Sequence, residues 1–109
     1  MLDEKTRLFY CAKVALALRE LKKMNAVHNK KIEKDNLSTD VRNDSYDKIA
    51  SEIDMRTATI SNLFNFRDDA QISTLVATIM GMERSMEEFG KTFDSISEQE
   101  VIRFLEKKA

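Results

Sequence analysis

The near absence of turn-forming residues limits the fold of this chain more than any other feature. Its 109 residues include no proline and only two glycines, Gly81 and Gly90. A sandwich or barrel of many short strands needs a turn every ~8–12 residues, and glycine and proline supply most of the tight ones. We therefore predict an all-α fold. The length fits one globular domain over residues 1–109.

The chain has one cysteine, Cys11, and one histidine, His28. This pair can form neither a disulfide framework nor a Cys/His zinc site of the usual four-ligand kind. The sequence also lacks a glycine-rich phosphate loop, a Ser/His/Asp arrangement with usable spacing and a redox-active cysteine pair. We expect that the protein is not an enzyme and that it uses no metal or other cofactor.

The overall charge is close to zero. With 18 Lys and Arg against 19 Asp and Glu, the formal net charge is −1, so the bulk basicity of many nucleic-acid binders is missing. The two halves differ, because residues 1–50 carry a net charge of +3 and residues 51–109 a net charge of −4. Any surface for nucleic acid must therefore be local.

The most apolar stretch of the sequence is short. It runs from Leu8 to Leu18, is interrupted by Lys13, and is well below the ~20 residues of a membrane span. No basic start followed by an apolar run marks a secretion signal. Together with the lone cysteine, these observations predict a cytoplasmic protein without a membrane partner.

Hydrophobic periodicity predicts a first helix over residues 6–24, where apolar residues recur at three- and four-residue steps. Residues 25–44 lose this pattern and are rich in Asn, Asp, Lys, Ser and Thr. We predict a long polar insertion there, a loop with at most one helical turn around residues 30–34.

The periodicity returns at Ser45, whose hydroxyl can cap a helix. Residues 45–65 then contain two short helices joined by a three-residue turn at residues 54–56. Two short helices that cross steeply need a small residue at the crossing, which Ala50 supplies, and apolar residues that share a core. This spacing is typical of a helix-turn-helix.

Two further helices are predicted over residues 72–94, the second beginning near Ser85. Ser97 and Glu100 have the spacing of a capping box, which predicts a C-terminal helix over residues 97–108. The apolar residues of the last two helices are candidates for a dimer contact: Met86, Phe89, Phe93, Val101, Ile102, Phe104 and Leu105.

Several residues keep the spacing of a known family. Ile49-Ala50, Met55 and Ile60-Ser61 match the phrase LA-x-x-x-x-V-S-x-x-x-I-S, while Leu18-Arg19 upstream and Ile72-Ser73-Thr74-Leu75 downstream fall in register. This set resembles the Cro and lambda-repressor type (XRE-like) family of helix-turn-helix DNA-binding proteins. The resemblance covers residues 14–24 and 45–93. It implies a lambda-repressor-like fold of five to six helices with a long insertion between the first and second.

Four positions depart from the family pattern. Asp54 and Glu83 stand where the family often has glycine, in the turn of the motif and after the fourth helix. Phe64 stands where a glutamate commonly pairs with the first-helix arginine, so Arg19 needs another partner, either solvent or the ring face of Phe64. Tyr46 replaces a glutamine that in the family touches phosphate or the recognition helix.

The resemblance implies that residues 57–65 form a recognition helix in the major groove, while the helix before it crosses the phosphate backbone. Arg56 can contact guanine or phosphate, Asn62 can pair with adenine, and Ala58 can pack against thymine methyl groups. No acidic side chain occurs from Met55 to Arg67. The predicted DNA-contacting residues are Ser45, Tyr46, Arg56, Thr57, Ala58, Thr59, Ser61, Asn62, Asn65 and Arg67.

We therefore expect a small transcriptional regulator, a repressor, that binds double-stranded DNA in a sequence-specific manner. A homodimer is expected because one recognition helix covers only about 4 to 5 base pairs. The alternative is a protein-interaction module, such as an antitoxin or an adaptor, that keeps the helix-turn-helix architecture and contacts a protein through its C-terminal helices.

Overall fold

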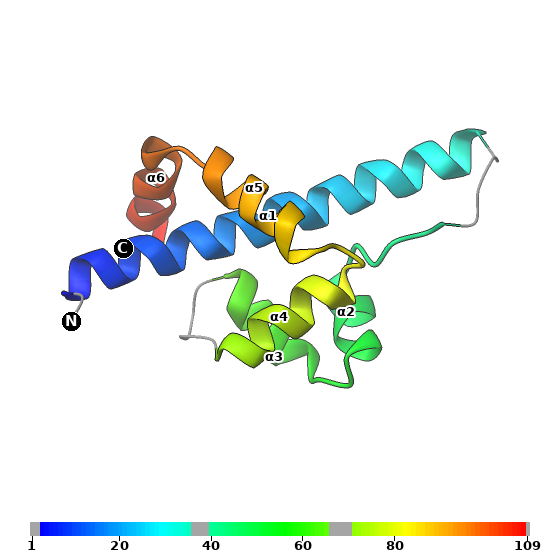
Figure 1. Ribbon diagram of the computed structural model, residues 1–109, viewed down its shortest axis with the longest axis horizontal. Coiled ribbons are helices and arrows are strands. Elements are labelled where there is room, and N and C mark those ends of the chain that lie inside the picture. Colours follow the sequence, from blue (N-terminus) through cyan, green and yellow to red (C-terminus); the bar gives the residue numbers. More distant parts are fainter. Residues whose placement is uncertain (1–2, 36–39, 66–70, 109) are drawn as a thin grey trace.

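The computed structural model describes residues 3–35, 40–65 and 71–108, and the regular secondary structure in these ranges is entirely helical. This confirms the predicted all-α class for the described ranges, where no helix combines the length and the apolar character needed to cross a membrane. The helices in chain order are α1 (Glu4–Asp35), α2 (Tyr46–Glu52), α3 (Thr57–Phe64), α4 (Ile72–Gly81), α5 (Met86–Ser95) and α6 (Glu98–Lys108) (Figure 1).

Helix α1 is the scaffold of the molecule. Its 32 residues span about 48 Å at 1.5 Å per residue, close to the 49 Å longest extent of the chain. Helices α3, α5 and α6 contact α1 directly, and Figure 1 shows α5 and α6 on one side of it and α2, α3 and α4 on the other. The face of α1 that is buried between them carries Ala12, Ala15, Ala17, Leu18 and Leu21.

The prediction of a polar insertion over residues 25–44 is wrong for its first part, because α1 continues to Asp35. Asn25, His28 and Asn29 occur at helical spacing and form a polar stripe in place of an apolar one. Asn25 is fully buried, and Asn29 exchanges two hydrogen bonds with the backbone of Arg42, at 2.6 and 2.8 Å. The returning segment therefore packs on α1 through amide hydrogen bonds, which a search for hydrophobic periodicity does not detect.

The later helix boundaries are close to those predicted, and side-chain caps account for most of their starts. The hydroxyl of Ser45 accepts from the backbone N–H of Lys48 at 3.2 Å. Ser97 and Glu100 form the predicted capping box, with both hydrogen bonds at 3.2 Å. A second capping box joins Ser85 and Glu88 at the start of α5, because serine and glutamate there have the same spacing.

Helices α2 and α4 end in the same way. Asp54 and Glu83 have positive φ angles of 54° and 59°. After α2, the N–H of Met55 bonds to the carbonyl of Ala50 at 2.9 Å and that of Asp54 to Ser51 at 3.3 Å. After α4, the N–H of Arg84 bonds to the carbonyl of Ile79, and the N–H of Glu83 bonds to the carbonyl of Met80. Both are Schellman motifs with an acidic residue at the left-handed position, where glycine is usual.

The core contains most of the apolar residues that were candidates for a dimer contact. Phe89, Val101 and Phe104 are buried within one chain, so they are not available to a second one. Met86 and Ile102 remain exposed at 45% and 44%. The expectation of a dimer contact through this whole set is therefore wrong, because α1 needs these side chains to cover its own apolar face.

Candidate nucleic-acid interface

Helices α2 and α3 form the predicted pair of short helices. Ile49, Ala50, Ile60, Leu63 and Phe64 are buried between them and the rest of the core. The left-handed turn at Asp54 lets the chain leave α2 and begin α3 only three residues later. The apolar side of α3 is held in the core, and its polar side is directed outward.

The exposed part of α3 is its N-terminal half. Arg56, Thr57, Ala58 and Thr59 are all exposed, whereas Ser61 and Asn62 are half-buried. Arg56 is the N-cap residue and makes no side-chain capping bond. Its guanidinium supplies a positive charge at this end of the helix, and α3 itself contains no charged residue.

The fold brings an acidic side chain to this surface that the local sequence lacks. The hydroxyl of Thr57 donates to Oδ1 of Asp47 at 2.8 Å. A carboxylate near the first turn of α3 is favourable for the helix dipole, but it lowers the positive potential that DNA requires. The absence of acidic residues between Met55 and Arg67 did not predict this contact, because Asp47 comes from the preceding helix.

The C-terminal end of α3 is occupied by contacts within the chain. Nε of Arg19 donates to the carbonyl of Phe64 at 2.8 Å, and its Nη2 donates to Oδ1 of Asn65 at 2.7 Å. The amide nitrogen of Asn65 donates to the carbonyl of Ser61 at 2.8 Å. Asn65 therefore stabilises the helix end instead of being free for a ligand. Arg67 lies outside the described residues.

Arg19 also connects α3 to the C-terminal helix. Its guanidinium lies 4.8 Å from the ring centroid of Phe104 in α6. The expected ring partner, Phe64, contributes its backbone carbonyl instead, so that prediction is wrong. A cation at a helix C-terminus interacts favourably with the helix dipole, which explains why an arginine at this position needs no glutamate on α3.

Ser45 and Tyr46 lie at the start of α2, where phosphate contacts were expected. Both are half-buried. The ring of Tyr46 packs against Phe64 with centroids 5.0 Å apart, and Nζ of Lys22 lies 5.0 Å above the same ring. Nζ of Lys48 lies 3.4 Å from Oδ1 of Asp44. The cations closest to α2 are thus already placed on partners of this chain.

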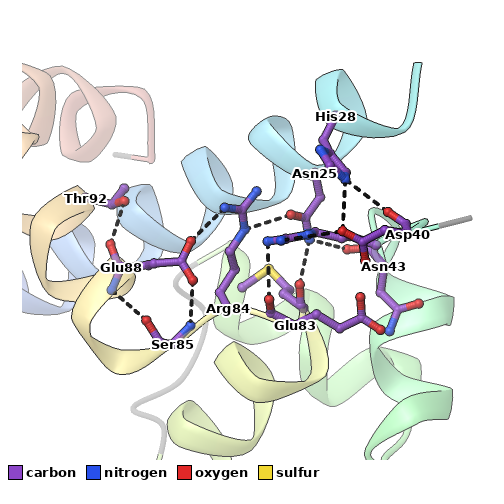
Figure 2. Close-up of polar contacts among 11 residues, drawn as sticks. Asn25, His28, Asp40, Asn43, Glu83, Arg84, Ser85, Glu88 and Thr92 are labelled. Atoms are coloured by element: carbon purple, nitrogen blue, oxygen red, sulfur yellow. Dashed lines mark hydrogen bonds and ion pairs between the residues drawn. The ribbon is translucent and has the colours of Figure 1, made fainter. Parts of the chain in front are cut away.

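A polar network holds the end of α4 against α1, and Figure 2 shows its members. The amide nitrogen of Asn25 donates to the carbonyls of Asn43 and Met82, at 2.8 and 2.9 Å. The amide nitrogen of Asn43 donates to the carbonyl of Gly81 at 2.7 Å. These amides satisfy carbonyls that a helix end leaves without partners. Sequence reasoning missed the network because its residues share no periodic pattern.

Arg84 extends the network to α5. Its Nε donates to Oδ1 of Asn25 at 2.9 Å, and its Nη1 donates to Oε2 of Glu88 at 2.8 Å (Figure 2). The hydrogen bond from Arg84 is the main reason why the pKa of Glu88 is lowered. Within the described ranges, no three His, Cys, Asp or Glu side chains gather as metal ligands.

Comparisons with known proteins identify no relative. No family model matches the sequence, and neither the curated proteins nor the solved structures contain a significant match. Function is therefore inferred from the residues of this chain and from their geometry.

Proposed function

We propose that this protein binds double-stranded DNA in a sequence-specific manner as a small transcriptional repressor. The observation that carries the proposal is the geometry of the segment from Asp54 to Thr59. A left-handed residue follows α2, and the N-cap residue and the first three residues of the next helix are exposed. A helix held by its apolar side, with a free N-terminal half, is the arrangement that helix-turn-helix proteins place in the major groove.

The second left-handed residue supports the same proposal. Asp54 and Glu83 are the only residues other than glycine with positive φ among those described. They are also the two positions at which the XRE-like family often has glycine. Because glycine is the residue that adopts this conformation most easily, the match indicates a common backbone path despite different residues.

The polar side chains on the outer side of α3 and at its N-cap suit contacts with bases and phosphates. Arg56 can bind guanine O6 and N7 or a phosphate, and the amide of Asn62 can bind adenine N6 and N7. Ala58 offers a methyl group of the size that packs against thymine. Because Arg56 is the exposed cation at this point and Asp47 lies nearby, we expect weak non-specific affinity and contacts that are concentrated at the N-terminal end of α3.

A salt titration of duplex binding tests this function. We expect log K to fall linearly with log salt concentration, by a slope of about one unit for each phosphate that a cation contacts, and no affinity at low salt would contradict the proposal. On a duplex selected for tight binding, Arg56→Ala and Asn62→Ala should each lower the specific affinity by ~1–3 kcal/mol. Arg103→Ala, which removes an exposed cation from α6, is the charge-matched control and should have little effect.

A homodimer is part of the proposal, and we place its contact on α4. Ile72 and Met80 are 80% and 58% exposed, with the half-buried Val76 between them at helical spacing. Helix α4 contains no charged residue, so two copies can pair without bringing like charges together. Met80→Glu should shift sedimentation toward the monomer, whereas Ile102→Glu on α6 should not. A wild-type protein that is monomeric on DNA would contradict this contact.

A protein-interaction module is the second candidate function. The acidic Asp47 beside α3 and the nearly neutral net charge favour it. Absence of DNA binding at low salt would support this alternative over the repressor.

A further inference from the structure

A groove lies between α1 and the turn that joins α4 to α5, in a part of the molecule that the DNA-binding proposal does not use. Its volume is about 320 Å³ and its surface is largely apolar. This volume lies at the lower end of the ~300–1,000 Å³ that is usual for small-molecule sites. The groove is lined by Glu20, Lys23, Met24, Val27, His28 and Arg84.

Arg84 is the polar group that is built into this groove. Its side chain is only 10% exposed, and its Nε and Nη1 are fixed by Asn25 and Glu88 (Figure 2). Its Nη2 has no partner among the described residues. Nε of Arg42 is the only buried side-chain nitrogen or oxygen without a partner in those residues, so Nη2 of Arg84 is not buried. It is a donor on a guanidinium that two hydrogen bonds hold in place, and it belongs to a residue that lines the groove.

We propose that the groove binds a small apolar carboxylate, a molecule with one carboxyl group and a short aliphatic tail. A carboxylate is the acceptor that makes the strongest hydrogen bonds to a guanidinium N–H. Met24 and Val27 are 40% and 60% exposed and offer apolar surface for the tail. The ammonium group of Lys23 adds a second cation at the rim.

The charges around the groove agree with this ligand. Glu88 faces Arg84 but is already bonded to Nη1, so it does not occupy Nη2. Glu20 is the acidic member of the lining, and the cations Lys23 and Arg84 outnumber it. The carboxyl group is therefore bound at Arg84, with the tail directed along Met24 and Val27.

Two hydrogen bonds connect Arg84 in the groove to the end of α4. Arg84 holds Oδ1 of Asn25, and the amide nitrogen of the same Asn25 donates to the carbonyl of Met82 at the end of α4. A carboxylate on Nη2 shares the guanidinium on which this hydrogen-bond chain depends. The bound carboxylate would therefore be connected to the C-terminal end of α4 by two hydrogen bonds.

Methyl NMR of the full chain tests the site, with hexanoate as the probe and 1-hexanol as its uncharged counterpart. We expect saturable shifts of the Met24 and Val27 methyl groups with hexanoate, and an affinity about tenfold lower for the alcohol, because the charge-assisted hydrogen bond is lost. No saturable shift, equal affinity for both probes, or shifts confined to other residues would overturn the proposal.

Two variants locate the ligand. Val27→Asp places a negative charge at an exposed position in the groove and should weaken hexanoate binding at least about tenfold. Ile102→Asp, at an exposed position on α6 outside the groove, should leave it unchanged. If Val27→Asp and Ile102→Asp bound hexanoate with the same affinity, the proposed location of the ligand would be contradicted. Arg84→Gln should also abolish binding, and circular dichroism shows whether it folds; if it does not fold, Val27→Asp decides. Neither result depends on DNA binding.

Discussion

Asp54 and Glu83 adopt a backbone conformation that is usual for glycine and unfavourable for residues with a side chain. Both are in the left-handed region, which costs residues other than glycine about 1–2 kcal/mol. Their position in two Schellman motifs explains why the conformation persists, since each motif closes with two backbone hydrogen bonds. The family resemblance marked both positions as unusual, but their conformation could be known only from the structure.

Replacing either residue by glycine should therefore stabilise the protein. Asp54→Gly and Glu83→Gly are each expected to raise the free energy of unfolding by about 0.5–1 kcal/mol, because relief of strain exceeds the added entropy of the unfolded chain. Urea denaturation measures the change. Glu52→Gly, in the last turn of α2, is the control and should lower stability by about 1 kcal/mol. If Asp54→Gly lowered stability as much as Glu52→Gly does, the claim that Asp54 is strained would be contradicted.

At the level of helices, Gly81 is required because α4 approaches α2 closely at this residue, whereas Gly90 has no such neighbour. A Cβ atom on Gly81 would lie 2.8 Å from Cγ2 of Ile53 and 3.4 Å from Cγ2 of Ile49. Helix α4 can thus cross the end of α2 at this distance only with glycine. A Cβ atom on Gly90 would meet nothing within 4 Å, although both glycines lie in helices of the same length.

The two glycines should respond in opposite directions to alanine. Gly81→Ala is expected to lower the free energy of unfolding by ~1–3 kcal/mol, because α2 and α4 must separate. Gly90→Ala should raise it by about 0.5–1 kcal/mol through helix propensity alone. Urea denaturation of both variants checks the pair. Stabilisation by Gly81→Ala would show that the two helices do not cross so closely.

The sequence predicted those helices whose buried face is apolar. Helices α2 to α6 follow a hydrophobic period or a serine cap, and their boundaries are close to those expected. The second half of α1 was missed because Asn25 and Asn29 bury amides that bond to distant backbone. Partners far apart in sequence, such as Asp47 with Thr57, were likewise outside the reach of local patterns. The polar side chains from Arg56 to Asn65 were all predicted to be exposed; those of residues 56–59 are, whereas Ser61, Asn62 and Asn65 are half-buried.

At the scale of the whole molecule, charge and architecture divide the surface into regions. Helix α1 separates the α2–α4 layer from α5 and α6 (Figure 1). Residues 1–50 carry a net charge of +3 and residues 51–109 a net charge of −4. The DNA contact that we propose is centred on Arg56, and its affinity should weaken as salt is added.

Amide chemical-shift mapping with a mixed-sequence duplex at low ionic strength locates the DNA contact on this chain. We predict that the largest perturbations fall on residues 56–59, at the exposed start of α3, and that α6 is unaffected. Perturbations that are largest on α5 and α6, or absent at every concentration of DNA, would contradict it.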